Sequence, residues 1–228
     1  MRTEDLIDAL ADKVEPVEPL RHPAARAMGW MIVSFVYLAG LVWLIGPRAD
    51  IADKLAEPRF VIEIAAALLT SLMAAIAAFC AGCPGRPLWE RFAPFPFLAV
   101  WLATLGEGCW RQWVQSGPDG LTFNIDLDCF QAIFLASILQ ALVILVMIRQ
   151  GAPLAPMSTT GLATLAATAI GAAGLRLFHA LDVSVMILVW QFGSVLLLAT
   201  IGFLAGNRYL KWSLPKIDGG DSGHRQTG

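Results

Sequence analysis

The feature that most constrains this chain is a series of long segments without a charged residue. Most approach the ~20 residues that an α-helix needs to cross about 30 Å of hydrocarbon at 1.5 Å per residue. Apolar residues make up 57% of the chain and charged residues 15%, whereas a soluble domain carries about 25% charge. The sequence therefore excludes a soluble enzyme, a nucleic-acid-binding module and a disordered scaffold. It predicts an integral membrane protein.

One span needs a continuation through charged residues. The uncharged window from Phe92 to Gly106 is too short to cross a bilayer, and we expect its helix to continue through Glu107 and Arg111 to Trp113. The fold class is then all-α, a polytopic bundle of six transmembrane helices preceded by a short cytoplasmic N-terminal helix. The expected spans are residues 27–47, 62–83, 93–113, 128–148, 157–178 and 183–207.

The distribution of Lys and Arg predicts the orientation. If the N-terminus is inside, only five of the 16 Lys and Arg residues fall on the opposite side, as the positive-inside rule favours. Both termini are then cytoplasmic, and the tail over residues 208–228 is expected to be disordered. The first 20 residues are acidic and lack an apolar core, so we expect no cleavable signal peptide.

Tryptophans and small residues indicate how the spans sit and pack. Trp101 and Trp190 are expected to pack in mid-span. Six tryptophans fall near predicted span ends, where indole rings anchor at the headgroups: Trp30, Trp43, Trp89, Trp110, Trp113 and Trp212. Alanines and glycines in the second and fifth spans favour close helix packing. Gly202 and Gly206 form a GxxxG motif that serves either packing within the bundle or a homodimer face.

The segment before the first span, residues 1–26, differs sharply from the rest. Between Thr3 and Leu20 it carries six acidic residues and one basic residue, Lys13. Leu6, Leu10 and Val14 recur at helical spacing and would form one apolar stripe. So short a helix is marginal in water. The segment is therefore either a solvated leader or a segment that folds on a partner, such as a DNA-binding protein with a basic surface.

If the segment binds a partner, its residues divide into two groups. The apolar contacts would be Leu6, Ile7, Leu10 and Val14, and the acidic residues facing a basic rim would be Asp5, Asp8, Asp12 and Glu15.

Several stretches in a fixed order carry a resemblance. RTEDLIDALA, PVEPLRHPAAR, ADKLAEPRFVIEIAAALLT, PGRPLWERF and RQGAPLAPMSTTGLATLAATAIGAAGLRLFHALD together resemble the NrsF family of membrane anti-sigma factors. The resemblance implies a six-span inner-membrane protein of a Gram-negative bacterium. Its cytoplasmic N-terminal segment would hold an extracytoplasmic-function (ECF) sigma factor inactive until a stress signal releases it. Two positions depart from the family pattern, with Ala180 where a Cys is frequent and Gln191 where a His is frequent.

Residues near the outer ends of the spans are candidates for signal sensing. Cys109 and Cys129 both approach the outer side, at a separation that is borderline for a disulfide. They are either sensors, through oxidation or soft-metal binding, or small apolar packing residues. Glu107 and Arg111 are spaced to form an ion pair along one helix. Arg176 and His179 are expected at the interface, where a long side chain can reach water at little cost.

A competing class is a small six-helix transporter or channel, which Glu107, the glutamines and the glycine-rich fifth span would suit. Against it, the two halves show no internal repeat and the fifth span has no proline break at mid-membrane. Motifs typical of hydrolases, P-loop proteins and dinucleotide-binding proteins are absent. We therefore predict no enzyme, cofactor or metal site.

Overall fold

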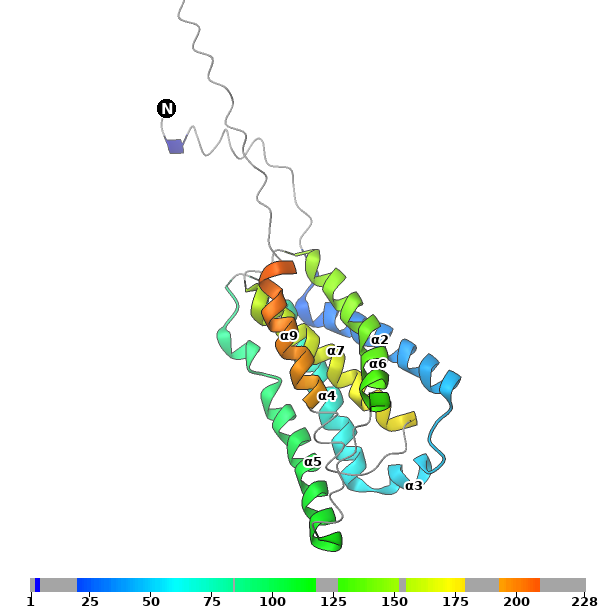
Figure 1. Ribbon diagram of the computed structural model, residues 1–228. Coiled ribbons are helices and arrows are strands. Elements are labelled where there is room, and N and C mark those ends of the chain that lie inside the picture. Colours follow the sequence, from blue (N-terminus) through cyan, green and yellow to red (C-terminus); the bar gives the residue numbers. More distant parts are fainter. Residues whose placement is uncertain are drawn as a thin grey trace, which may run out of the picture.

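The computed structural model describes residues 3–4, 20–83, 85–117, 127–151, 155–178 and 193–209, with the side chains of Cys109, Gln112, Ser116, 127–134, Ser194 and 206–209 outside that description. These parts form helices only, which confirms the all-α expectation for them (Figure 1). The helices in chain order are α2 (Pro23–Ile45), α3 (Ile51–Ala56), α4 (Pro58–Ala81), the 3₁₀ helix η1 (Leu88–Arg91), α5 (Phe95–Ser116), α6 (Leu127–Arg149), α7 (Pro156–Phe178) and α9 (Gly193–Tyr209).

Within the described residues, four segments are long and apolar enough to cross a membrane, as expected of a membrane protein. They are α2, α4, the stretch Leu88–Gln115 that joins η1 to α5, and α7. Helix α5 runs unbroken past Glu107 and Arg111, so the expected continuation is confirmed. Six spans were predicted. Helix α6 has a shorter apolar part, Leu135–Arg149, and α9 has Val195–Ala205. Residues 183–192 of the predicted sixth span lie outside the described residues.

Local sequence explains where the long helices begin and end. Proline occupies the first turn of α2, α4 and α5, where its missing N–H leaves no bond unmade. His22 caps α2, with its Nδ1 accepting a hydrogen bond from the Ala24 N–H at 3.3 Å. Gly46 ends α2 at φ +93° and Gly117 ends α5 at φ +64°, conformations that favour glycine.

Helix α7 lies at the centre of the bundle and packs against α2, α4, α6 and α9. Its small residues allow this. A Cβ added at Gly171 would lie 3.3 Å from the Ser137 backbone nitrogen of α6, and one at Gly174 would lie 2.7 Å from a Leu38 methyl of α2. The Ser71 hydroxyl of α4 donates a hydrogen bond to the Ala166 carbonyl at 2.7 Å. Close backbone approach is thus the main packing mode, as predicted from composition.

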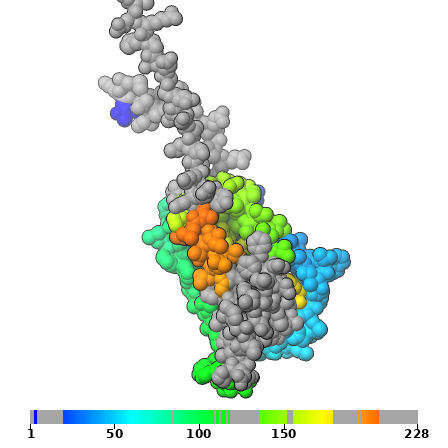
Figure 2. All heavy atoms as spheres, in the orientation of Figure 1, coloured from blue at the N-terminus to red at the C-terminus, as the bar shows by residue number. Residues whose placement is uncertain are grey.

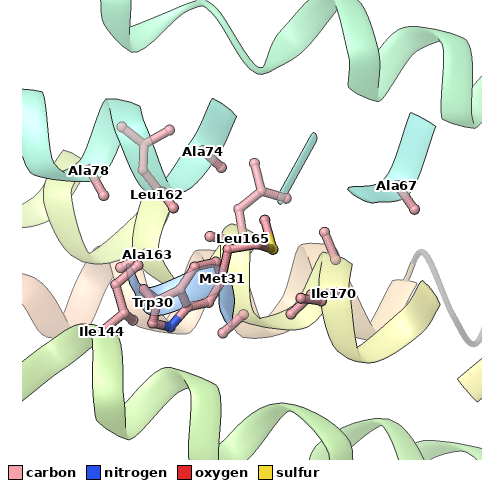
Figure 3. Close-up of a cluster of buried hydrophobic side chains, with 14 of the residues drawn as sticks. Trp30, Met31, Ala67, Ala74, Ala78, Ile144, Leu162, Ala163, Leu165 and Ile170 are labelled. Atoms are coloured by element: carbon pink, nitrogen blue, oxygen red, sulfur yellow. The ribbon is translucent and has the colours of Figure 1, made fainter. Parts of the chain in front are cut away.

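Trp30 corrects one expectation. Its ring was expected at the headgroups, yet it is fully buried among α4, α6 and α7, beside Ile144 and Ala163 (Figure 3). Its Nε1 donates to the Gln140 carbonyl of α6 at 3.0 Å. A buried N–H needs such a partner, and α6 supplies it.

The other described tryptophans behave as expected. Trp101 is fully buried, and four tryptophans near helix ends are exposed, namely Trp43, Trp89, Trp110 and Trp113.

Gly202 of α9 packs against α7 of the same chain. A Cβ at this position would meet the Thr164 side chain of α7, and it would lie 3.3 Å from the Thr160 carbonyl oxygen. The missing side chain therefore lets α9 approach α7, which is the intramolecular alternative. The side-chain surroundings at Gly206 lie outside the described residues.

Candidate functional site

Charged side chains gather at the end of the bundle where α3 lies. We call the group the α3-end cluster, which consists of Arg48, Asp50, Phe60, Glu63 and Arg176. The residues come from the α2–α3 connection and from α4 and α7. Every member except Asp50 is buried. A buried charge is tolerated only when it is paired, and this cluster provides the partners.

The Phe60 ring is close to both arginines of the cluster. Its ring centroid is 5.9 Å from Arg48 Cζ and 5.3 Å from Arg176 Cζ. The ring face attracts cations, and more strongly where water is excluded. Only 2% of Phe60 is exposed, so this attraction acts in a nearly dry environment.

The Glu63–Arg176 ion pair joins α4 to α7. Arg176 Nε lies 3.0 Å from Glu63 Oε1, and the two side chains are 9% and 3% exposed. Arg176 was expected to extend to the interface. That expectation is wrong, because the side chain turns inward to Glu63. Because both side chains are buried, removing either one would leave the other charge buried without its partner and destabilise the fold.

Arg48 lies in the connection after α2 and contacts both Asp50 and helix α7. Its guanidinium donates two hydrogen bonds to the Asp50 carboxylate, at 2.6 and 2.7 Å. Arg48 holds the pKa of Asp50 down at about 2. Its backbone N–H donates to the Leu177 carbonyl of α7 at 3.0 Å. The end of α2 is thereby tied to the end of α7.

A second contact at this end joins α4 to α5. Arg59 Nε donates to the Thr104 carbonyl at 3.1 Å, and its guanidinium fills the space that a side chain at Gly108 would occupy. Glycine at 108 therefore allows the arginine to cross between the helices.

The predicted Glu107–Arg111 pair forms, with Arg111 Nη2 2.6 Å from Glu107 Oε1. Both side chains are exposed on α5, at 46% for Glu107 and 64% for Arg111. This ion pair therefore differs from the Glu63–Arg176 pair of the α3-end cluster, whose side chains are buried.

The opposite end of the bundle fixes the start of α2. Arg26 is buried, its Cζ lies 4.4 Å from the Phe79 ring centroid of α4, and its guanidinium donates to the Met147 carbonyl of α6. The first turn of α2, which contains the last residues of the N-terminal segment, is therefore held between two other helices.

Comparison with known proteins identifies a family for this chain. The chain fits the sequence model of NrsF, negative regulator of sigma F, over residues 10–212. The chain belongs to the NrsF family. No curated protein and no solved structure matches it. NrsF is a family of regulators of sigma factors and not of enzymes.

The structure describes only some of the residues that the sequence analysis predicted to sense a signal or bind a partner. Glu107, Arg111 and Arg176 are described: Glu107 and Arg111 pair with each other on α5, and Arg176 pairs with Glu63 of α4. His179 and the predicted partner-binding residues lie outside the described residues, as do the side chains of Cys109 and Cys129. Within the described parts, no three His, Cys, Asp or Glu residues come together as a metal site.

Sequence reasoning missed four members of the α3-end cluster, which are Arg48, Asp50, Phe60 and Glu63. Arg48 lies one residue beyond the predicted first span, and Glu63 is the second residue of the predicted second span. Helix α4 begins at Pro58, so Glu63 lies inside its second turn. The signal that could have found it is an acidic residue one turn inside a span, which needs a cation from another helix.

Gln140 of α6 is buried, but among the described residues neither its Oε1 nor its Nε2 has a hydrogen-bond partner. The bridge to α2 uses the Gln140 backbone carbonyl instead.

Proposed function

We propose that this chain is a membrane-bound anti-sigma factor that sequesters an ECF sigma factor through its N-terminal segment and releases it on a periplasmic or membrane stress signal. The observation that carries the proposal is the family match over residues 10–212 to a negative regulator of sigma F. The four helices that are apolar and long enough to cross a membrane support the anchor. The proposed location is the bacterial inner membrane, with both termini cytoplasmic.

The N-terminal segment has the chemistry to bind a sigma factor. Leu6, Ile7, Leu10 and Val14 would enter an apolar groove, and Asp5, Asp8, Asp12 and Glu15 would face basic residues around it. A sigma factor that binds DNA carries such basic residues. The partner is therefore recognised by apolar burial together with charge complementarity.

Helix α2 is suited to carry a signal from the α3 end to this segment. At its far end the connection through Arg48 contacts α7, and at its near end Arg26 contacts α4 and α6. A shift of α2 against α4 and α7 would move the residues that immediately precede Pro23. In this proposal the α3-end cluster keeps the helices in the arrangement that permits sequestration.

The proposed sensing residues lie near the periplasmic ends of the spans. They are Cys109, Cys129, Glu107, Arg111, Arg176 and His179. For the cysteines, the plausible chemistry is oxidation or binding of a thiophilic metal by the thiolates. Cys129→Ser should then abolish induction of the sigma regulon by an oxidant or such a metal. Unchanged induction would eliminate the cysteines as sensors.

Deletion of residues 1–20 tests the proposed function. The deleted protein should still insert in the membrane but lose all repression of a sigma-dependent reporter. A transporter would keep its activity without this segment, so intact function after the deletion would favour that class.

A pair of point variants tests the binding face. Leu10→Asp places a charge in the apolar stripe and should prevent co-purification of the sigma factor. Ala9→Asp introduces the same charge beside the stripe and should retain the partner. Normal co-purification with Leu10→Asp would show that the stripe is not the binding face.

A further inference from the structure

An apolar groove runs between η1, the first turns of α5, and helices α7 and α9. Its volume is about 570 Å³. It exists because α5 packs mainly against α4 whereas α9 packs against α7, which leaves the start of α5 and the side of α9 apart. In Figure 2 the surface of α9 lies beside that of η1 and the start of α5. The lining includes Phe95, Leu98, Leu165, Leu196 and Phe203.

The groove opens toward the surroundings of the bundle. Phe95, Leu196 and Phe203 line it and are 47%, 55% and 41% exposed. Helices of this length and hydropathy are surrounded by hydrocarbon when they cross a membrane. The lining hydroxyls are satisfied internally, since Ser158 donates to the Ala155 carbonyl and Thr200 to the Leu196 carbonyl. An occupant of the groove body is therefore apolar.

One end of the groove carries a positive charge at headgroup level. Arg91 lines this end, and on the same 3₁₀ helix Leu88 is 65% and Trp89 68% exposed. Exposed tryptophan marks the level of the lipid headgroups. The neighbouring acid Glu90 is paired with Arg86, whose Nε lies 3.3 Å from Glu90 Oε2. Among the described residues Arg91 makes no ion pair, and it is a half-buried residue of the groove lining, so its charge can pair with an anionic group of an occupant.

We propose that this groove binds one acyl chain of an anionic phospholipid whose phosphate is held by Arg91. The occupant must combine a flexible apolar chain with a negative group at the membrane surface, and an anionic phospholipid has both. Guanidinium and phosphate form strong charge-assisted hydrogen bonds. The inference rests on the membrane location in the proposed function, although it involves neither the N-terminal segment nor the sigma factor.

Native mass spectrometry of the full chain tests the site, with phosphatidylglycerol and phosphatidylcholine of identical acyl chains as probes. The wild-type protein should retain one phosphatidylglycerol molecule in preference to phosphatidylcholine. Arg91→Gln should reduce that retention about fivefold, the effect of one arginine near an anionic surface, and leave phosphatidylcholine unchanged. Arg149→Gln removes an exposed arginine outside the groove and should not change retention.

Two variants that fill the groove test the acyl-chain contact. Ala199→Trp and Leu196→Trp should each abolish retention of both lipids. Leu196 is the second choice because its exposure makes a large side chain easier to accommodate. Ala99→Trp adds the same ring to α5 at an exposed position that does not line the groove, and it should bind lipid as the wild type does.

Several results would overturn the inference. The first is equal retention of phosphatidylglycerol and phosphatidylcholine by the wild type. The second is retention of lipid by a folded Ala199→Trp or Leu196→Trp variant. The third is a protein dimer that these two variants dissociate. The dimer would show that a second copy occupies the groove. Loss of reporter repression has no bearing on lipid retention, so the failure of this inference and that of the proposed function are separate results.

Discussion

Arg176 and Glu63 form an ion pair between α7 and α4, with Nε and Oε1 3.0 Å apart, in a place where both side chains are almost wholly buried. The pair lies in the α3-end cluster, where Arg176 also approaches the Phe60 ring. Because α7 is the central helix, this contact holds the N-terminal part of α4 against the bundle.

Breaking the Glu63–Arg176 pair from one side should strongly destabilise the fold. Glu63→Gln leaves the Arg176 charge buried without its carboxylate, and removal of one partner of a buried pair costs about 3–5 kcal/mol. The double variant Glu63→Gln with Arg176→Met should recover part of this loss. Thermal unfolding in detergent micelles measures both.

The exposed pair on α5 is the matched control for that experiment. Glu107→Gln removes the carboxylate from an ion pair of similar distance, and an exposed pair contributes about 0.2–1 kcal/mol. If Glu63→Gln and Glu107→Gln cost the same, burial does not set the strength of the cluster.

The Asp50–Arg48 contact should make stability depend on acid. Arg48 lowers the pKa of Asp50 from 3.8 to about 2, so the folded state favours the ionised carboxylate. This contribution is complete above about pH 4 and is lost as pH falls toward 2. The difference in unfolding temperature between wild type and Asp50→Asn should therefore shrink below pH 4. A difference that stays constant from pH 6 to pH 2 would contradict the assignment.

Gly171 should tolerate no side chain. A Cβ there would lie 3.2 Å from Ser137 Cβ and 3.3 Å from the Ser137 backbone nitrogen, so α6 and α7 must separate. Overpacking of this kind costs about 1–3 kcal/mol. Gly40→Ala in α2 meets no atom within 4 Å and should be neutral or stabilising, because alanine favours a helix. Equal unfolding temperatures for the two variants would show that the contact between α6 and α7 is loose.

Replacing Gln140 should stabilise the protein. Both polar atoms of its amide are buried without a hydrogen-bond partner among the described residues, and such a group costs about 1–3 kcal/mol. Gln140→Leu keeps a similar volume and removes the polar atoms. We expect a higher unfolding temperature for Gln140→Leu than for the wild type. Trp30→Phe serves as a comparison: it removes the hydrogen bond to the Gln140 carbonyl and should lower the unfolding temperature. A destabilised Gln140→Leu variant would mean that the amide has a partner in the folded protein.

Some features of this protein follow from local sequence. The helices of α2, α4, α5 and α7 could be predicted because an apolar run of sufficient length has to form a helix in lipid, where each backbone group needs a partner within its own segment. The Glu107–Arg111 pair could be predicted for a similar reason, since residues four apart on one helix are neighbours.

Other features depend on which helices meet. Trp30 was expected at the headgroups because its position along the chain is near a span end, but α6 provides a buried carbonyl for its N–H. Arg176 turned inward because Glu63 lies on the neighbouring helix. Hydropathy along one segment reports its depth in the membrane, whereas the direction in which a side chain points depends on lateral packing. The sequence by itself therefore determined the long apolar helices α2, α4, α5 and α7, and only the tertiary structure decided which charges and rings are buried together.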